Sequence, residues 1–291
     1  MPFDIPQPVA IVAHDAGGAN QIIALLKAHA DEFEVRAYLE GPALKLWMQA
    51  FPSSNLCASL EDALDGSQSL LAGTGWASNL EFNAIDLALN SGLHAIALLD
   101  HWTNYEQRFI RSNRSIHPSE YWVVDQYALS IAKRAFSNRT LRQVPDYYLQ
   151  SQIEKIGTPS TDDDILLYIL EPARSDWGKS GPGEFQALDY TFEKLPLMEL
   201  PSGVQICLRP HPSENKEKYQ SWITQHANVN IEIDNSPTLA DALSKSKWVA
   251  GCESYALTLA LASGRTVYCT LPPWAPTCRL PHEGLIQVKS L

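Results

Sequence analysis

Short apolar runs alternate with longer segments of mixed character along the whole chain. Runs of about four to eight apolar residues are typical of strands buried on both faces, and the longer segments have amphipathic helical spacing. The alternation predicts βα units and mainly parallel sheets. The expected strands are Val9–Ala13, Glu34–Leu39, Leu70–Ala72, His94–Leu99, Tyr121–Val124, Ile165–Leu170, Val204–Leu208, Val229–Ile233, Trp248–Ala250 and, last before a proline-rich tail, Thr266–Thr270.

Helices are expected between these strands. The spacing of apolar residues predicts them at Gln21–Ala30, Ala43–Ala50, Leu80–Leu89, Asp125–Phe136, Glu184–Leu195, Glu214–His226, Thr238–Ser246 and in a segment after Ser254 that ends near Ala262. Prolines, a glycine and three aspartates interrupt the rhythm between Pro145 and Asp164, which is typical of a linker. We place the linker at Gly157–Asp163 and expect two Rossmann-like α/β domains, residues 1–157 and 158–291.

Length and charge narrow the class of protein. The chain has 291 residues, which suits two domains of about 150 residues each. Its 33 acidic residues outnumber 22 basic ones and leave a net charge of −11. Binding to a phosphate backbone needs a basic surface, so we expect no nucleic-acid polymer as a partner. A small basic site for one phosphorylated metabolite fits this balance.

Cysteine usage and the N-terminus point to the cytoplasm. The five cysteines are widely spaced and form no Cys-x-x-Cys pair, so we interpret them as reduced thiols. The N-terminus lacks a basic and then apolar leader, and no apolar run reaches about 18 residues. We therefore expect a cytoplasmic protein with no integral membrane segment. No metal-ligand spacing is evident, and no metal is expected.

A polar motif containing two glycines follows the first strand. In open parallel sheets, ligands bind beyond the carboxyl ends of the strands. Gly17 and Gly18 would let a ligand approach the backbone closely, and Asp15 could act as a general base. In the alternative interpretation, the glycines form a tight turn and Asp15 caps the following helix. We name His14, Gly17 and Gly18 as candidate acceptor-binding residues.

Glycines also follow the third strand, in the segment Gly73–Ser78. This segment partly matches a dinucleotide-binding fingerprint but lacks its third glycine. A turn that carries part of an acceptor site is therefore preferred over NAD binding.

The fourth strand is followed by a dense motif, Asp100–Tyr105. Asp100 and His101 are candidate acceptor-binding residues, and the neighbouring Trp102 and Tyr105 suit stacking on a sugar or base. In the alternative, the two aromatic residues anchor the loop in the core.

An arginine and a histidine follow a strand in the second half. Arg209 offers a charged fork for a phosphate, and His211 could donate a proton to a phosphate or a leaving oxygen. Pro210 and Pro212 flank the imidazole and restrict its loop.

The segment Gly251–Tyr255 also lies between a strand and a helix. Ser254, Tyr255 and the first helical N–H groups could hold an anion, and Glu253 could accept hydrogen bonds from a ribose. The alternative is an ordinary serine N-cap. Lys179 lies in a glycine-rich loop that either closes over a phosphate or is a mobile surface loop.

These motifs resemble those of GT-B glycosyltransferases, nearest to bacterial capsule and sialic-acid transferases and CDP-glycerol glycerophosphotransferases. Those families carry a His-Pro motif whose histidine meets the donor phosphate, which maps to His211 and Pro212, and a later serine motif, which maps to Ser254. The sialyltransferases also carry an acidic-acidic-Gly motif whose second acid is the base. Asp15 is the matching candidate, although His14 replaces the first acid and an alanine intervenes before the glycine.

The resemblance implies a GT-B-like glycosyltransferase of surface-polysaccharide synthesis whose two parallel sheets face a central cleft. A nucleotide sugar would be the donor substrate on the C-terminal side, a saccharide or lipid-linked molecule the acceptor, and no cofactor is needed. The glutamate pair of many retaining members is missing, since Leu261 stands eight positions after Glu253, so an inverting reaction is favoured. A homodimer is compatible with this role. A nucleotide-sugar 2-epimerase or hydrolase, and a non-catalytic subunit of a polysaccharide assembly complex, remain as alternatives.

Overall fold

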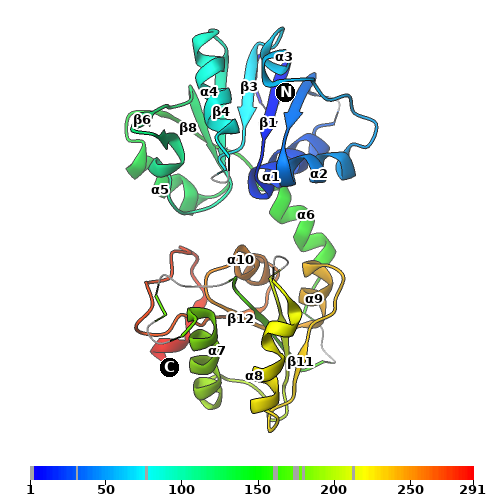
Figure 1. The fold of residues 1–291 in the computed structure, drawn as a ribbon, viewed down its shortest axis with the longest axis vertical. Helices are drawn as coiled ribbons and strands as arrows, with labels where there is room; N and C mark the ends of the chain where they lie inside the picture. The colour runs from blue at the N-terminus through cyan, green and yellow to red at the C-terminus, as the bar shows by residue number, and fades with distance from the viewer. Residues whose placement is uncertain are drawn as a thin grey trace. The chain divides into compact units, whose positions relative to one another are not determined.

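The chain folds into two compact units, Met1–Ser151 and Gln152–Leu291 (Figure 1). The computed structural model describes residues 3–30, 32–75, 78–159, 163–172, 177–178, 181–211 and 214–291. The division falls inside helix α6, Tyr147–Ile156, which the sequence did not predict.

The first unit is built on a six-stranded sheet with the order β2-β1-β3-β4-β7-β8, and all neighbours are parallel. All five residues of β1 are buried, because layers cover both faces of this strand. The strands are β1 (Val9–Ala13), β2 (Val35–Leu39), β3 (Ser69–Ala72), β4 (His94–Leu99), β7 (Glu120–Val123) and β8 (Thr140–Gln143), with a separate antiparallel pair, β5 (Ile110–Arg111) and β6 (Arg114–Ser115).

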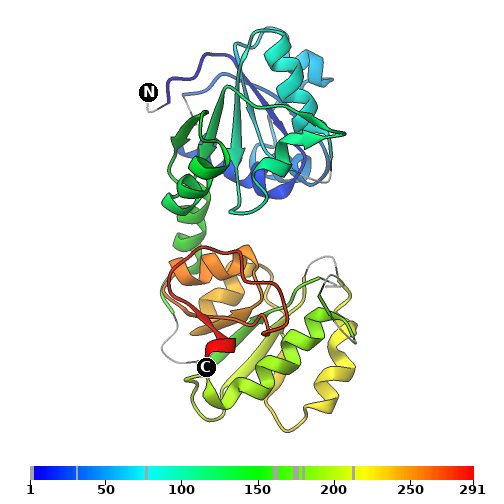
Figure 2. The ribbon, with the colours of Figure 1, turned by 90° about the vertical axis from the view of Figure 1, so that its left-hand side faces the viewer.

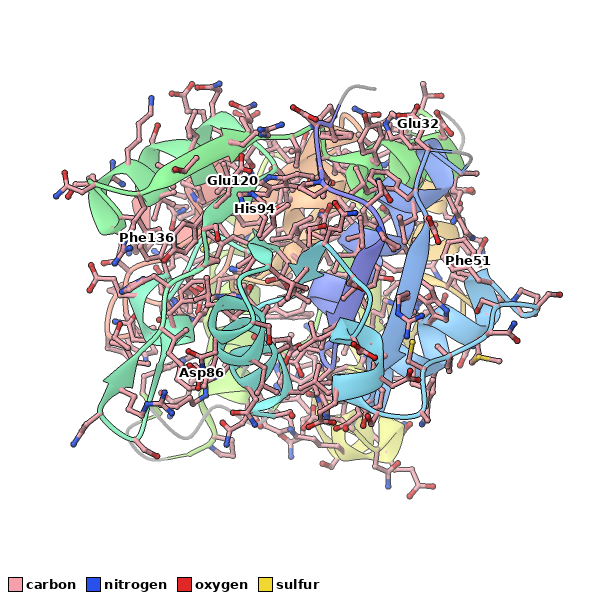
Figure 3. All side chains as sticks on the ribbon, turned by 90° about the horizontal axis from the view of Figure 1, so that it is seen from above. Glu32, Phe51, Asp86, His94, Glu120 and Phe136 are labelled. Carbon is pink, nitrogen blue, oxygen red and sulfur yellow. The ribbon has the colours of Figure 1, made fainter. Side chains whose placement is uncertain are left out.

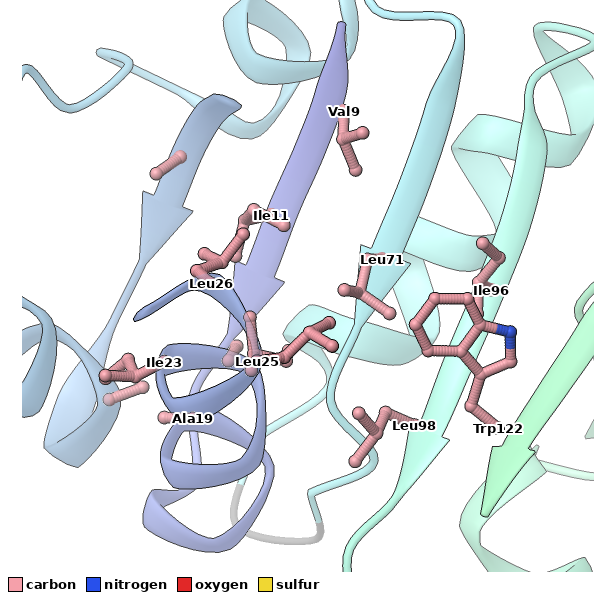
Figure 4. Packing of buried hydrophobic residues seen from close by; sticks show 14 of the residues in the cluster. Val9, Ile11, Ala19, Ile23, Leu25, Leu26, Leu71, Ile96, Leu98 and Trp122 are labelled. Atoms are coloured by element: carbon pink, nitrogen blue, oxygen red, sulfur yellow. The ribbon is translucent and has the colours of Figure 1, made fainter. Parts of the chain in front are cut away.

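Helices connect these strands across both faces of the sheet. They are α1 (Ala16–Ala28), α2 (Gly41–Ala50), α3 (Leu60–Leu64), α4 (Leu80–Asn90), α5 (Gln126–Ala135) and the 3₁₀ turn η1 (Glu106–Phe109), whereas α6 follows the last strand, β8. Helix α1 packs Leu25 and Leu26 towards Ile11, Leu71 and other strand side chains in one apolar cluster (Figure 4).

The chain leaves β1 and β3 in opposite directions along the sheet. The connection after β1 leads to β2 on one side, whereas the connection after β3 leads to β4 on the other. Right-handed crossovers therefore place α1 and α4 on opposite faces. The loops diverge between these adjacent strands, at the point where open α/β sheets bind ligands.

The amino ends of the strands carry a structural ion cluster. Glu120 at the start of β7 is buried; its carboxylate accepts a 2.6 Å hydrogen bond from Arg142 and lies 3.4 Å from the ring of His94. Figure 3 labels His94 and Glu120 side by side. This cluster lies at the opposite edge from the polar motifs, so we assign it to packing.

The second unit repeats the architecture, with the order β11-β10-β9-β12-β13-β14 and only parallel neighbours. Tyr168, Leu208 and Ala250 lie in its central apolar cluster. The strands are β9 (Ile165–Ile169), β10 (Gln205–Arg209), β11 (Ile231–Ile233), β12 (Trp248–Gly251), β13 (Thr266–Cys269) and β14 (Leu285–Gln287).

Helices again lie on both sides of this sheet. In Figure 2, the green and yellow helices α7 and α8 lie on one side and the orange α10 on the other. The helices are α7 (Gly183–Lys194), α8 (Gln220–Gln225), α9 (Leu239–Lys245) and α10 (Tyr255–Ala262), with 3₁₀ turns η2 (Leu195–Leu197), η3 (Lys216–Tyr219) and η4 (Val288–Ser290). Strands β9 and β12 are adjacent and lead away from each other, so the second loop divergence lies there.

The expected architecture of two parallel α/β sheets is confirmed, with local corrections. Thr266–Thr270 is not the last strand, because β14 in the proline-rich tail pairs with β13. The first helix begins at Ala16 rather than Gln21 and includes both glycines that were expected in a loop. The helix expected at Glu214–His226 is divided into η3 and α8.

Candidate functional site

Two glycines bring the loops after β1 and β3 into contact. A Cβ atom on Gly18 would lie 2.9 Å from the Cα atom of Gly73, and one on Gly17 would lie 1.8 Å from an oxygen of Asp100. The glycines therefore serve close packing within the first turn of α1, and the tight-turn interpretation is wrong. This packing brings the polar motifs after β1, β3 and β4 together at one edge of the sheet.

Asp15 occupies the N-cap position of helix α1, yet its side chain makes no capping hydrogen bond. Its Oδ1 instead lies 2.8 Å from Nδ1 of His14, and the two side chains are partly exposed. The second oxygen, Oδ2, faces Gly75, because a Cβ on that glycine would lie 2.5 Å from it. The alternative interpretation, in which the Asp15 side chain caps the helix, is therefore wrong, and a carboxylate paired with an imidazole lies at the sheet edge.

A second carboxyl group lies beneath this pair. Glu81, in the first turn of α4, is only 3% exposed, and its Oε1 accepts a 2.8 Å hydrogen bond from the backbone N–H of His14. Burial raises the pKa of Glu81 above its ordinary value, the His14 N–H lowers it, and the charge of Asp15 raises it further. The site thus holds two neighbouring carboxyl groups with different surroundings.

Asp100 is held by an arginine of the following 3₁₀ turn. Arg108 Nη1 donates to Asp100 at 2.7 Å, and also to the backbone and side-chain oxygens of Thr74 at 2.8 and 2.9 Å. The guanidinium thereby joins the loop after β3 to the loop after β4. His101, the next candidate, is half-buried, and its Nδ1 lies 3.2 Å from the hydroxyl of Thr103.

The aromatic residues of this motif belong to the core. Trp102 and Tyr105 are each 3% exposed; the Trp102 indole donates to Asp125 at 2.8 Å, and Tyr105 stacks on Phe136. The hypothesis that they stack on a sugar or base is therefore wrong, and they anchor the loop instead. Their partners Asp125 and Phe136 flank α5 and are distant in the chain, so the local sequence does not reveal these contacts.

In the second unit, the loops after β9 and β12 meet through a glutamate. The buried Glu171 accepts a 3.1 Å hydrogen bond from the backbone N–H of Glu253. Glu253 in turn pairs with Arg279, whose backbone N–H also donates to it at 3.2 Å. The Glu171 carboxylate therefore already accepts a backbone N–H beside the start of α10, at the place where the sequence predicts a bound anion.

Ser254 is the N-cap of α10, and its hydroxyl accepts a 3.3 Å hydrogen bond from Ala256. Tyr255, half-buried, is the first residue of that helix. The N-cap interpretation of Ser254 is confirmed, and the residue lies in the loop at the carboxyl end of β12.

Arg209 is the last residue of β10, one residue beyond the predicted end of this strand, and His211 lies in the loop that follows. The Arg209 guanidinium pairs with Asp234 and donates to the carbonyl of Ser236 at 3.2 Å, which joins it to the loop after β11. His211 is exposed. Lys179 and Pro212, together with Trp76 and Ala77 of the glycine motif, lie outside the described residues.

Sequence reasoning missed Glu81 and Glu171. The pattern Ser78-x-x-Glu81 is typical of a capping box, which would assign Glu81 to the helix start alone. Its contact with His14 joins positions far apart in the chain. Glu171 carries no local signal beyond following a strand.

The described part of the chain contains neither a metal-ligand cluster nor a membrane-spanning helix. No three His, Cys, Asp or Glu side chains there gather as a metal site. None of the described helices is long and apolar enough to cross a membrane.

The arrangement of the chain is similar to that of several sugar-nucleotide epimerases. The UDP-GlcNAc 2-epimerase of Methanocaldococcus jannaschii matches with a TM-score of 0.59 and 9% identity, over 90% of this chain and 83% of that one. The S. aureus MnaA–UDP structure matches at 0.56 and 12%, over 90% and 79%. The chain has a GT-B-like fold.

A further match supports the same fold. The UDP-GlcNAc 2-epimerase of Neisseria meningitidis, bound to UDP-GlcNAc, matches with a TM-score of 0.57 and 9% identity, over 90% of this chain and 82% of that one. No family model matches the chain, and no curated protein matches it. At these identities the likeness is one of fold, and function has to be argued from the residues.

Proposed function

We propose that the protein is a nucleotide-sugar enzyme that transfers a sugar to an acceptor hydroxyl during surface-polysaccharide synthesis in the cytoplasm. The observation that carries this proposal is the pair formed by Asp15 and His14 at the carboxyl edge of the first sheet. The fold is shared with proteins whose structures contain UDP or UDP-GlcNAc. A partly exposed carboxylate at this position suits a general base.

The proposed reaction is a single inverting displacement. Asp15 takes the proton of the acceptor hydroxyl, and the acceptor oxygen forms a bond to the anomeric carbon of the donor sugar. The bond between that carbon and the phosphate oxygen breaks, and the nucleotide leaves with the electron pair. His211 donates a proton to the departing phosphate.

The remaining candidates take supporting roles in this proposal. Arg209 at the carboxyl end of β10, and Ser254 and Tyr255 after β12, would hold the donor phosphates, and Glu253 would hold the donor ribose. Asp100 and His101 would line the acceptor side. Arg209 and Glu253 already pair with Asp234 and Arg279, so their share in binding would require an exchange of partners.

The central test is turnover of UDP-GlcNAc with and without a saccharide acceptor. We expect Asp15→Ala and His211→Ala to lower turnover by about 10²–10⁴-fold, since each removes one proton-transfer group. Asp65→Ala, at an exposed aspartate of the first unit, is the matched control and should leave turnover unchanged. Wild-type turnover in either test variant would remove that residue from the mechanism.

The neighbouring carboxyl groups of Asp15 and Glu81 favour a second candidate, a nucleotide-sugar 2-epimerase or hydrolase. Epimerisation removes a proton from one face of a sugar carbon and returns one to the other, which needs both a base and an acid. An epimer or a free sugar formed from UDP-GlcNAc alone would favour this candidate. Absence of nucleotide binding in calorimetry against CMP, CDP, UDP and GDP would instead favour a non-catalytic subunit.

A further inference from the structure

The side chain of Glu81 joins two loops that the chain separates widely. It projects from the first turn of α4, after β3, and its Oε1 accepts the backbone N–H of His14, after β1. A Cβ atom built on Gly75 would lie 2.5 Å from Asp15 Oδ2 and 3.0 Å from Glu81 Oε1. The two carboxyl groups are therefore close to each other. Glu81 therefore holds the backbone immediately before Asp15.

The other oxygen of Glu81 is not needed for that hydrogen bond. Oε2 is buried and has no hydrogen-bond partner among the described residues. A buried polar atom without a partner costs free energy, and a second carboxylate nearby adds repulsion when both are ionised. A glutamine could accept the same N–H without that repulsion, so fixing the loop alone does not explain a carboxyl group here.

We propose that Glu81 is a positioning residue for Asp15, fixing the His14–Asp15 backbone and coupling its own carboxyl group to the Asp15 carboxylate. The role rests on Asp15 being the base of the proposed reaction. The groups that face Glu81 are His14 and Asp15 from the loop after β1; beyond them, Arg108 and Asp100 form the pair that contacts Thr74.

The coupling has a definite sign. Burial raises the pKa of Glu81, and the Asp15 charge raises it further, so Glu81 keeps its proton to higher pH than an ordinary glutamate. The interaction between two charges is mutual, and an ionised Glu81 makes Asp15 a stronger base. The base therefore strengthens as the pH rises through the raised pKa of Glu81.

The first test is independent of activity and uses the full chain. In Glu81→Gln, the amide oxygen can still accept the His14 N–H, and we expect hydrogen exchange of that amide to remain slow. In Glu81→Ala the acceptor is lost, and exchange should accelerate. Glu61→Ala, at an exposed first-turn glutamate of α3, is the matched control.

A carboxyl ¹³C NMR titration tests the coupling itself. Asp15→Asn removes the neighbouring charge, so the pKa of Glu81 should fall relative to the wild type. If this titration is unchanged by Asp15→Asn, or if His14 exchange is unchanged in Glu81→Ala, the positioning role is overturned, whether or not the protein is active.

Kinetics with UDP-GlcNAc provide the functional test. A displaced base can cost about 10²-fold, so kcat should fall by about that factor in Glu81→Ala while KM stays within about twofold. Glu81→Gln should restore much of kcat but lose the rise in activity through the Glu81 titration. A Glu81→Gln variant with the wild-type pH profile would overturn the coupling. If the NMR results hold and the wild type turns over no nucleotide sugar, the proposed function fails and the coupling stands.

Discussion

Contacts between loops determine which residue types fit at individual positions of the first unit. Gly18 lies in a helix, where glycine is ordinarily unfavourable, yet its Cα faces Gly73 of another loop with no space for a methyl group. The same contact sets how closely the Asp15 and Glu81 loops approach. A substitution here should therefore disturb both stability and the site.

Gly18→Ala and Gly73→Ala form a matched pair on this contact. The Gly18 methyl group would meet backbone at 2.9 Å, and we expect a loss of about 1–3 kcal/mol in the free energy of unfolding, as is typical of overpacking. The Gly73 methyl group would have its nearest neighbour at an ordinary 3.5 Å, and this variant should be less affected. Urea unfolding measures both, and equal losses would contradict the packing argument.

At the scale of elements, an arginine links the loops after β3 and β4. The side chain of Arg108 is 5% exposed and that of its partner Asp100 is 18% exposed. The pair is largely buried and also satisfies the oxygens of Thr74. Removing the guanidinium would leave the Asp100 carboxylate largely buried without this cation.

Arg108→Met should therefore lower the free energy of unfolding by about 3–5 kcal/mol, the range found when one partner of a buried pair is removed. Arg114→Met is the matched control, because the Arg114 side chain is 64% exposed and pairs with Asp86 at the surface. The control should cost under about 1 kcal/mol. Denaturant unfolding measures both variants. Similar losses in the free energy of unfolding would show that the Arg108–Asp100 pair contributes no more to stability than a surface pair.

At the scale of the whole molecule, each unit has its own sheet and its own apolar clusters. The cluster around β1 and α1 contains only residues of the first unit, and those around β9 and β12 only residues of the second. Units with separate cores are able to unfold separately.

We accordingly expect two transitions in calorimetry of the full chain. Arg108→Met should lower the melting temperature of one transition only, which identifies it with the first unit. UDP, if bound by the second unit as proposed, should raise the other transition by mass action. A single transition that Arg108→Met and UDP both shift would contradict independent cores.

Elements with strong local patterns were predicted well, and those fixed by distant contacts were not. His94–Leu99 has the predicted bounds because an apolar run between polar residues is itself the signal. Strand β14 was missed because it has three half-buried residues in a proline-rich tail and forms by pairing with β13. Helix α6 was missed because the change in composition around it resembled a linker.

The sequence alone determined the fold class and the positions of the polar motifs at strand ends, because burial of apolar runs and the period of each element are local properties. Only the tertiary structure decided which of those polar residues meet. The contact of Glu81 with His14, the burial of Trp102 and the Gly18–Gly73 contact all depend on loops from different strands converging at one sheet edge. Strand order decides that convergence, and no local pattern in the chain encodes strand order.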